Sequence, residues 1–185
     1  STVSDIFGNK GVIIADADVA ARRGVEPGRP AFKAIVDFFG TEILQKDGYL
    51  DRAKLRNIVF QDETKRLFLE SKTRGPIVQD LLSEVSRAQS PYSILVLSTG
   101  LGKVMGMNRL LVVDAPTDLQ IERVMARDNN PKSQVEAILE TQPPRNLRLK
   151  DADDIILNDG DVEQLAVEVE KLHQLYLKKA REHVS

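Results

Sequence analysis

The 185-residue sequence contains no cysteine, and this absence excludes a disulfide framework, a thiolate nucleophile and a zinc site built on cysteine. It also lacks any run of about 20 apolar residues, the length that a membrane-spanning helix needs. Its first residues, STVSDIFGNKG, have neither the basic start nor the apolar run of a signal peptide. These absences lead us to expect a soluble protein of the reducing cytoplasm.

A strong excess of either charge is missing as well. The net charge is -2 at pH 7, so the chain has no overall attraction for nucleic acid or for a membrane surface. The hydrophobic share of 42% and the charged share of 29% are ordinary for a globular protein of this length. We therefore expect one domain, with at most small insertions, and no nucleic-acid or membrane partner.

Four short apolar runs predict buried strands, at residues 12–15, 94–97, 110–113 and 154–157. The first three lack regular alternation, which is typical of strands that are covered on both faces of a parallel sheet. Helical patterns lie between the runs, and this alternation favours an α/β fold.

The helical patterns are spread unevenly along the chain. They lie at residues 3–7, 31–39, 52–59, 62–71, 77–89, 117–127, 132–141 and 162–180. Mostly helical stretches at 18–92 and 118–151 separate strands, so we expect two helical insertions into one α/β core.

The first predicted strand is followed by Asp16-Ala17-Asp18. Ligands of open parallel sheets bind at the carboxyl ends of strands. A carboxylate there could take a proton from an attacking hydroxyl or help to hold Mg²⁺. The alternative, of equal weight, is that one of the two carboxylates caps the next helix. Asp114, after the third strand, predicts mainly a turn and a helix start.

Two arginines, Arg145 and Arg148, are three residues apart and share one face of a helix. Guanidinium groups bind phosphate in a bidentate manner and neutralise charge in phosphoryl transfer. On spacing alone, a solvated helix face is the more frequent explanation. Asn158 opens a turn that could line a base pocket, although a plain turn is more common. Asp51-Arg52 predicts a helix start with a structural role.

Several short strings are weak one by one but specific as an ordered set. They are Asp16-Ala17-Asp18, Arg22, Val25-Glu26-Pro27-Gly28, Phe38-Phe39-Gly40, Asp47-Gly48-Tyr49-Leu50-Asp51-Arg52, Leu55-Arg56, Ser90-Pro91-Tyr92, Leu111-Val112-Val113-Asp114, Arg127-Asp128-Asn129-Asn130, Ala152-Asp153-Asp154 and Asn158. In this order and spacing they resemble dephospho-coenzyme A kinase along nearly the whole chain. The resemblance implies a P-loop NTPase core, with a three-layer parallel sheet, that carries a helical substrate domain and a lid. It also implies transfer of the γ-phosphoryl of ATP, with Mg²⁺, to the ribose 3′-hydroxyl of dephospho-CoA, the last step of coenzyme A synthesis.

The resemblance also implies roles and domain bounds by position. The core would comprise residues 1–20, 90–117 and 152–185, the substrate domain 21–89 and the lid 118–151. The implied general base is Asp18, and the implied substrate-binding residues are Arg22 and Arg56. The implied ATP-binding residues are Ser1, Thr2, Arg145, Arg148 and Asn158, with Ser1 also a ligand of Mg²⁺. The alternatives are another small-metabolite or nucleoside monophosphate kinase, since fold does not fix substrate, and a non-catalytic relative without the P-loop.

The chain departs from the family pattern in three places. The glycines and lysine of the phosphate-binding loop, with the strand before them, precede Ser1 in that pattern. Without them the γ-phosphate has no cradle of backbone N–H groups, so we expect the 185 residues as written to be inactive. We also expect the polypeptide to continue upstream by about a dozen residues or more. The segment after Leu97 lacks a family loop that contacts substrate, and Arg74-Gly75 replaces an apolar pair.

Overall fold

The computed structural model describes residues 2–97, 106–115, 121–122, 125–126, 131–133, 136 and 145–184. The chain divides into two compact units. We call Ile13–Leu97 the helical unit, and Ser1–Val12 together with Ser98–Ser185 the C-terminal unit. Within the described ranges, no helix has both the length and the apolar character needed to span a bilayer.

The helical unit contains a pair of parallel strands, β1 (Ile13–Asp16) and β2 (Ser93–Val96). Ile13 lies opposite Ser93, and Asp16 lies opposite Val96. The prediction of these two strands is confirmed, with each strand displaced by one residue from its predicted position. A parallel pair needs a long crossover connection, and the helices of the unit provide it.

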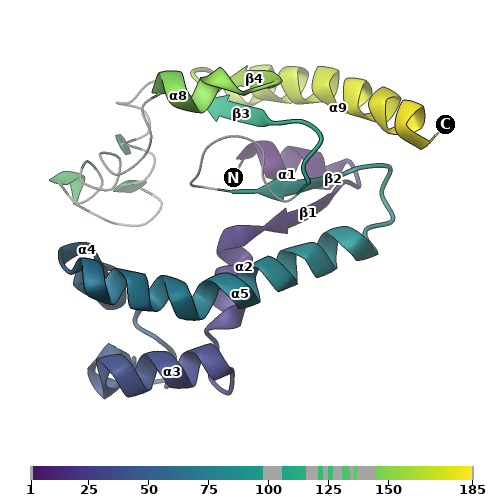
Figure 1. The fold of residues 1–185 in the computed structure, drawn as a ribbon. Coiled ribbons are helices and arrows are strands. Elements are labelled where there is room, and N and C mark those ends of the chain that lie inside the picture. The colour runs from purple at the N-terminus through teal and green to yellow at the C-terminus, as the bar shows by residue number, and fades with distance from the viewer. Residues whose placement is uncertain are drawn as a thin grey trace. The chain divides into compact units, whose positions relative to one another are not determined.

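The helices of this crossover are α2 (Ala17–Gly24), α3 (Pro30–Phe39), α4 (Arg52–Gln61) and α5 (Glu63–Arg87), with a short 3₁₀ turn at Thr41–Ile43. Helices α2, α3 and α4 all contact α5 (Figure 1). One core cluster, of Ile35, Ile43, Leu50 and Leu55, lies among them. Asp51 begins α4 as its N-cap, because its carboxylate accepts a hydrogen bond of 3.1 Å from the backbone N–H of Lys54.

The prediction of two helices at 62–71 and 77–89 is wrong, because α5 is a single helix that continues through Gly75 and Pro76. Proline has no N–H to donate, and its ring crowds the Cβ of the residue before it. Gly75 has no Cβ, which relieves that crowding. Packing also stabilises the continuous helix: Leu81 is buried with Ala15 and Ala20, so tertiary contacts override the local helix-breaking signal.

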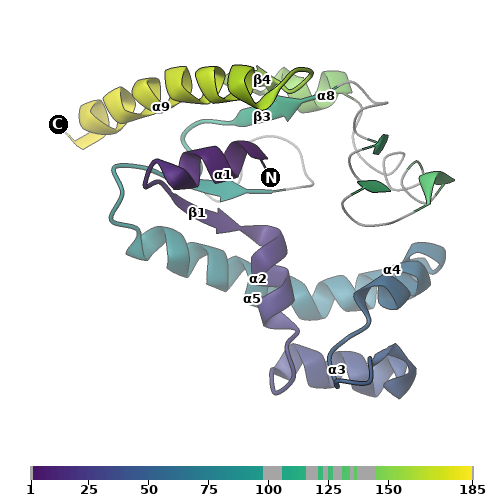
Figure 2. The ribbon, with the colours of Figure 1, turned by 180° about the vertical axis from the view of Figure 1, so that it is seen from behind.

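The C-terminal unit contains the second parallel pair, β3 (Leu111–Asp114) and β4 (Asp154–Leu157), in which Leu111 lies opposite Asp154. Its described helices are α1 (Thr2–Asn9), α8 (Arg145–Lys150) and α9 (Val162–Val184). Helix α9 contacts both α1 and β4 (Figure 2). The predicted strands and terminal helices are thus confirmed, and the predicted helices at 117–127 and 132–141 lie largely outside the described residues.

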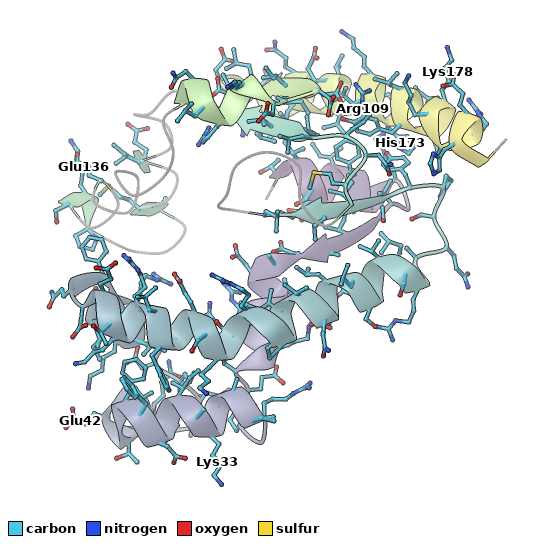
Figure 3. The ribbon with its side chains drawn as sticks, in the orientation of Figure 1. Lys33, Glu42, Arg109, Glu136, His173 and Lys178 are labelled. Carbon is cyan, nitrogen blue, oxygen red and sulfur yellow. The ribbon has the colours of Figure 1, made fainter. Side chains whose placement is uncertain are left out.

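A polar network holds β4 to its neighbours. Asp154 accepts two hydrogen bonds, at 2.9 and 3.1 Å, from the guanidinium group of Arg109, which Figure 3 labels. It also accepts one of 2.7 Å from the hydroxyl of Tyr176 on α9. The side-chain hydrogen bond to Asp154 raises the pKa of Arg109. The ring of Tyr176 stacks on Phe7 of α1 with centroids 6.1 Å apart. One tyrosine therefore joins α1, β4 and α9.

Candidate active site

The two aspartates at the end of β1 have different roles. The Oδ1 of Asp16 accepts hydrogen bonds from the backbone N–H groups of Asp18, at 2.8 Å, and of Val19, at 3.4 Å. Asp16 is therefore the N-cap of α2, which confirms the capping alternative for this residue. The side chain of Asp18 does not serve as this cap and is exposed in the first turn of α2.

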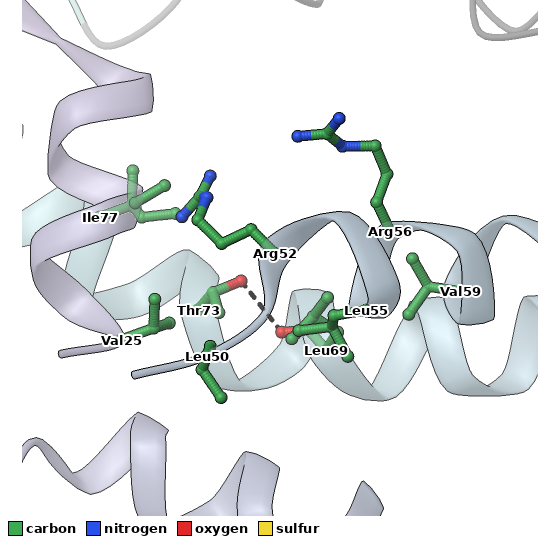
Figure 4. Close-up of a pocket in the computed structure, with 10 residues that line it drawn as sticks. Val25, Leu50, Arg52, Leu55, Arg56, Val59, Leu69, Thr73 and Ile77 are labelled. Atoms are coloured by element: carbon green, nitrogen blue, oxygen red, sulfur yellow. Dashed lines mark hydrogen bonds between the residues drawn. The ribbon is translucent and has the colours of Figure 1, made fainter. Parts of the chain in front are cut away.

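Basic residues of α2 and α4 lie near Asp18. Arg22 follows Asp18 by four residues and therefore shares its face of α2. Arg52 and Arg56 have the same spacing on α4, and in Figure 4 both guanidinium groups lie above Leu50, Leu55 and Leu69. They border a cavity of about 240 Å³ in the helical unit. Its lining is Ala21, Val25, Leu50, Arg52, Leu55, Arg56, Val59, Leu69, Thr73 and Ile77.

The electrostatics show that these charges act on one another. Partial burial, and then the positive charges of Arg22 and Arg56, lower the pKa of Arg52, while the negative charge of Asp18 opposes the shift. Among the described residues, no carboxylate lies within 4.0 Å of the nitrogens of these three guanidinium groups to form an ion pair. A cluster of like charges of this kind suits an anionic ligand.

The sequence analysis found Arg22 and Arg56 but missed Arg52. It assigned Asp51-Arg52 a structural role, and the structure confirms that role for Asp51, the N-cap of α4. The spacing of four residues between Arg52 and Arg56 was the available signal, because it places both on one face of α4.

A second group of predicted residues gathers in the C-terminal unit, at the carboxyl ends of β3 and β4. The backbone N–H of Asn158 donates to the carbonyl of Asp114 at 2.7 Å. Asp114 ends β3 rather than forming the predicted turn, and it is 1% exposed. Its Oδ1 lies 3.7 Å from the Nη2 of Arg148 on α8. The structure therefore gives Arg148 a buried acidic partner that the sequence analysis did not anticipate.

Near these strand ends, Thr2 and Asn158 border a cavity of about 160 Å³. Its lining is Thr2, Asn158, Gly160, Asp161, Val162 and Leu165. Thr2 begins α1, and the N-terminus of a helix presents N–H groups and a partial positive charge to anions. Two predicted ATP-binding residues are thus brought together.

Two further predicted ATP-binding residues are Ser1 and Arg145. Ser1 lies outside the described residues, and for Arg145 only the backbone, at the start of α8, is described. No group of three or more Asp, Glu, His or Cys side chains in the described ranges could hold a metal ion. Mg²⁺ in kinase sites usually takes only one or two protein oxygens together with substrate phosphates, so such a site needs no cluster of carboxylates.

Comparisons with known proteins bear on the family and the fold of the chain. A family model described as dephospho-CoA kinase matches residues 1–164. A dephospho-CoA kinase of Shewanella oneidensis is 42% identical over 99% of this chain and 90% of its own length. One of Yersinia pseudotuberculosis is 41% identical over 97% of this chain and 88% of its own.

Solved structures extend the likeness to the fold. TT1252 from Thermus thermophilus matches 94% of this chain and 89% of its own, with a TM-score of 0.73 and 26% identity. A dephospho-CoA kinase from Campylobacter jejuni matches 96% of this chain and 91% of its own, with a TM-score of 0.65 and 24% identity. The second likeness, at that identity, concerns the fold alone.

Proposed function

Because the chain belongs to the dephospho-CoA kinase family and is an ATP-dependent kinase with the P-loop NTPase fold, we propose that its acceptor is the ribose 3′-hydroxyl of dephospho-CoA. Transfer of the γ-phosphoryl group of ATP to that hydroxyl is the last step of coenzyme A synthesis. We also propose that the reaction takes place in the cytoplasm. The observation that carries the proposal is that the charges of Asp18 and Arg22 act on Arg52, which borders one cavity together with Arg56.

In this proposal Asp18 is the general base. Its carboxylate accepts the proton of the attacking ribose hydroxyl, whereas the carboxylate of Asp16 is the N-cap of α2. Arg22 and Arg56 bind the anionic part of the acceptor, because guanidinium groups bind phosphate oxygens in a bidentate manner. Phosphoryl transfer asks the protein mainly to position the reactants and to neutralise charge, and these three side chains do both.

The C-terminal unit would bind ATP. Thr2 and Asn158 border its cavity, and Arg145 and Arg148 of α8 would neutralise the phosphates. Mg²⁺, when bound, neutralises charge on the transferred group, and the hydroxyl of Ser1 would be its protein ligand. The division into a core (1–20, 90–117 and 152–185), a substrate domain (21–89) and a lid (118–151) is part of the same proposal.

The role of Asp18 is tested by Asp18→Asn in an assay of ADP release with dephospho-CoA as acceptor. A general base contributes about 10²–10⁴-fold to rate, so we expect kcat to fall by about 10²-fold or more while ATP binding changes little. Asp16→Asn is the matched control: it removes the same charge, but asparagine caps a helix as well as aspartate does. Unchanged turnover in Asp18→Asn would remove this residue from the base role, and a larger loss in Asp16→Asn would transfer that role to Asp16.

The acceptor is tested by comparing dephospho-CoA with AMP and CMP in the same assay. We expect ADP release to depend on dephospho-CoA. Equal or faster release with a nucleoside monophosphate would contradict the proposed acceptor while leaving the kinase reaction intact, because fold alone does not fix the substrate.

A further inference from the structure

The cavity of the helical unit is too small to enclose a whole molecule of the proposed acceptor. Its volume is about 240 Å³, whereas pockets that enclose a drug-sized ligand measure about 300–1,000 Å³. Dephospho-CoA consists of adenosine, a diphosphate and a long pantetheine arm, and is itself larger than most such ligands. The cavity can therefore hold one part of it, and its chemistry indicates which part.

The lining of the cavity is mostly aliphatic and includes no aromatic ring. Its one uncharged polar side chain is that of Thr73, whose hydroxyl already donates to the carbonyl of Leu69 at 2.9 Å (Figure 4). A purine buried here would leave its ring nitrogens and amino group without partners, which costs free energy. An aliphatic chain would bury methyl and methylene groups against matching surface, and it could keep its amides toward the open side.

The charged residues at the border of the cavity favour an anion. Arg52 and Arg56 belong to its lining, and Arg22 is close enough to Arg52 to help lower the pKa of that residue. Three like charges repel one another, and two adjacent phosphate groups would turn this repulsion into attraction.

We propose that the cavity holds the pantetheine arm of the acceptor and that Arg52, together with Arg22 and Arg56, binds the diphosphate. This inference rests on the proposed function. The order of groups in the acceptor, from arm to diphosphate to ribose, matches the order of features in the helical unit: the aliphatic cavity, the arginines, and Asp18 one helical turn before Arg22. Arg52 is thereby assigned as a further substrate-binding residue.

The test measures binding by calorimetry, with dephospho-CoA and 4′-phosphopantetheine as two separate ligands. Val59→Phe adds a ring to the cavity wall, and Arg52→Gln removes one guanidinium group. Arg74→Gln is the control, because it removes a charge from an exposed position of α5 that does not border the cavity. Thermal unfolding of each variant checks that the fold is intact. Val59→Ile, which adds a single methylene at the same position, replaces Val59→Phe if the larger substitution prevents folding.

We expect phosphopantetheine to bind the unmodified protein. Arg52→Gln should weaken both ligands by about tenfold or more, and dephospho-CoA at least as much as phosphopantetheine, because dephospho-CoA carries two phosphate groups instead of one. Val59→Phe should weaken both ligands by a common factor of about tenfold or more. Arg74→Gln should change neither affinity. An arm-binding cavity predicts this common factor because both ligands carry the same arm.

Two results would overturn the inference. One is an absence of phosphopantetheine binding to a protein that binds dephospho-CoA. The other is a Val59 variant that weakens dephospho-CoA alone, which would place the adenosine in the cavity. Both differ from failure of the proposed function, in which phosphopantetheine binds as expected but dephospho-CoA is not phosphorylated.

Discussion

The two units of this protein hold their arginines in opposite ways. In the C-terminal unit, Arg148 lies beside the buried carboxylate of Asp114, with Nη2 and Oδ1 3.7 Å apart. In the helical unit, partial burial and then the charges of Arg22 and Arg56 lower the pKa of Arg52. A protein carboxylate lies within ion-pair distance of the first arginine, whereas none of the described carboxylates lies within 4.0 Å of the second group. The comparison teaches that a proposed ATP-binding arginine can also take part in a structural ion pair, whereas the proposed acceptor-binding arginines have no such pair among the described residues.

The largest effect on stability is expected from Asp114→Asn. This substitution keeps the size of the side chain but leaves the partly buried guanidinium of Arg148 without its counter-charge, so we expect the free energy of unfolding to fall by about 2–3 kcal/mol. Chemical denaturation measures the change. Asp151→Asn, at an exposed position just after α8, is the control and should stay within about 0.5 kcal/mol of the unmodified protein.

A second variant separates the ion pair from other roles of Asp114. If the loss comes from the unbalanced charge of Arg148, then Arg148→Met in the Asp114→Asn background should recover part of it. Additive losses in the double variant would show that Asp114 and Arg148 stabilise the protein independently, and the contrast between the two units would be lost.

Arg52→Gln should change the free energy of unfolding less than Asp114→Asn does, and any change should be an increase. Removal of one of three like charges relieves repulsion, so we expect a free energy of unfolding within about 0.5 kcal/mol of the unmodified protein, or slightly above it. Arg23→Gln is the matched control in the same unit, because Arg23 pairs with Asp80, at 3.1 Å, and with Glu84. It should lower stability. A larger loss in Arg52→Gln than in Arg23→Gln would mean that Arg52 is structural after all.

These outcomes relate to what the sequence could and could not predict. The strands were predictable because they are short apolar runs between helical patterns, and Asp51 was predictable as a cap from its position before a helix. The continuity of α5 was not, because Gly75-Pro76 is a local breaking signal and the packing of Leu81 against Ala15 and Ala20 depends on residues far apart in the chain.

The candidate site shows the same division. Asp18, Arg22 and Arg56 could be proposed from ordered motifs, because the motifs keep their spacing along the chain. The pairing of Arg148 with Asp114 joins residues from two different elements, and no local pattern contains that information. Arg52 was missed although its spacing from Arg56 was visible, because the adjacent Asp51 supplied a sufficient structural explanation for the pair.

The smallest effect on stability is expected from a substitution at Glu170. Glu170 forms an exposed ion pair with Lys10, so it tests whether exposure makes such a pair weaker than that of Arg148 with the buried Asp114. Hydrogen bonds from Lys10 and then from Gln174 lower the pKa of Glu170 below its usual 4.5. A depressed pKa in the folded state stabilises the protein above pH 4.5, and that contribution is lost as the pH falls through the folded value. Glu170→Gln should therefore be slightly less stable than the unmodified protein at neutral pH, and the difference should shrink in acid and in high salt.

Urea unfolding of both proteins at pH 7 and at about pH 3 measures this difference. Glu168→Gln is the control on the same helix, because the partner of Glu168, Lys171, also belongs to α9. Its effect should be confined to the local helix, whereas the pair of Lys10 and Glu170 joins α9 to the residue that follows α1. A deficit in Glu170→Gln that persists unchanged in acid would show that the amide disturbs packing. In that case the ionised carboxylate, unlike that of Asp114, would contribute nothing to the stability of the unit.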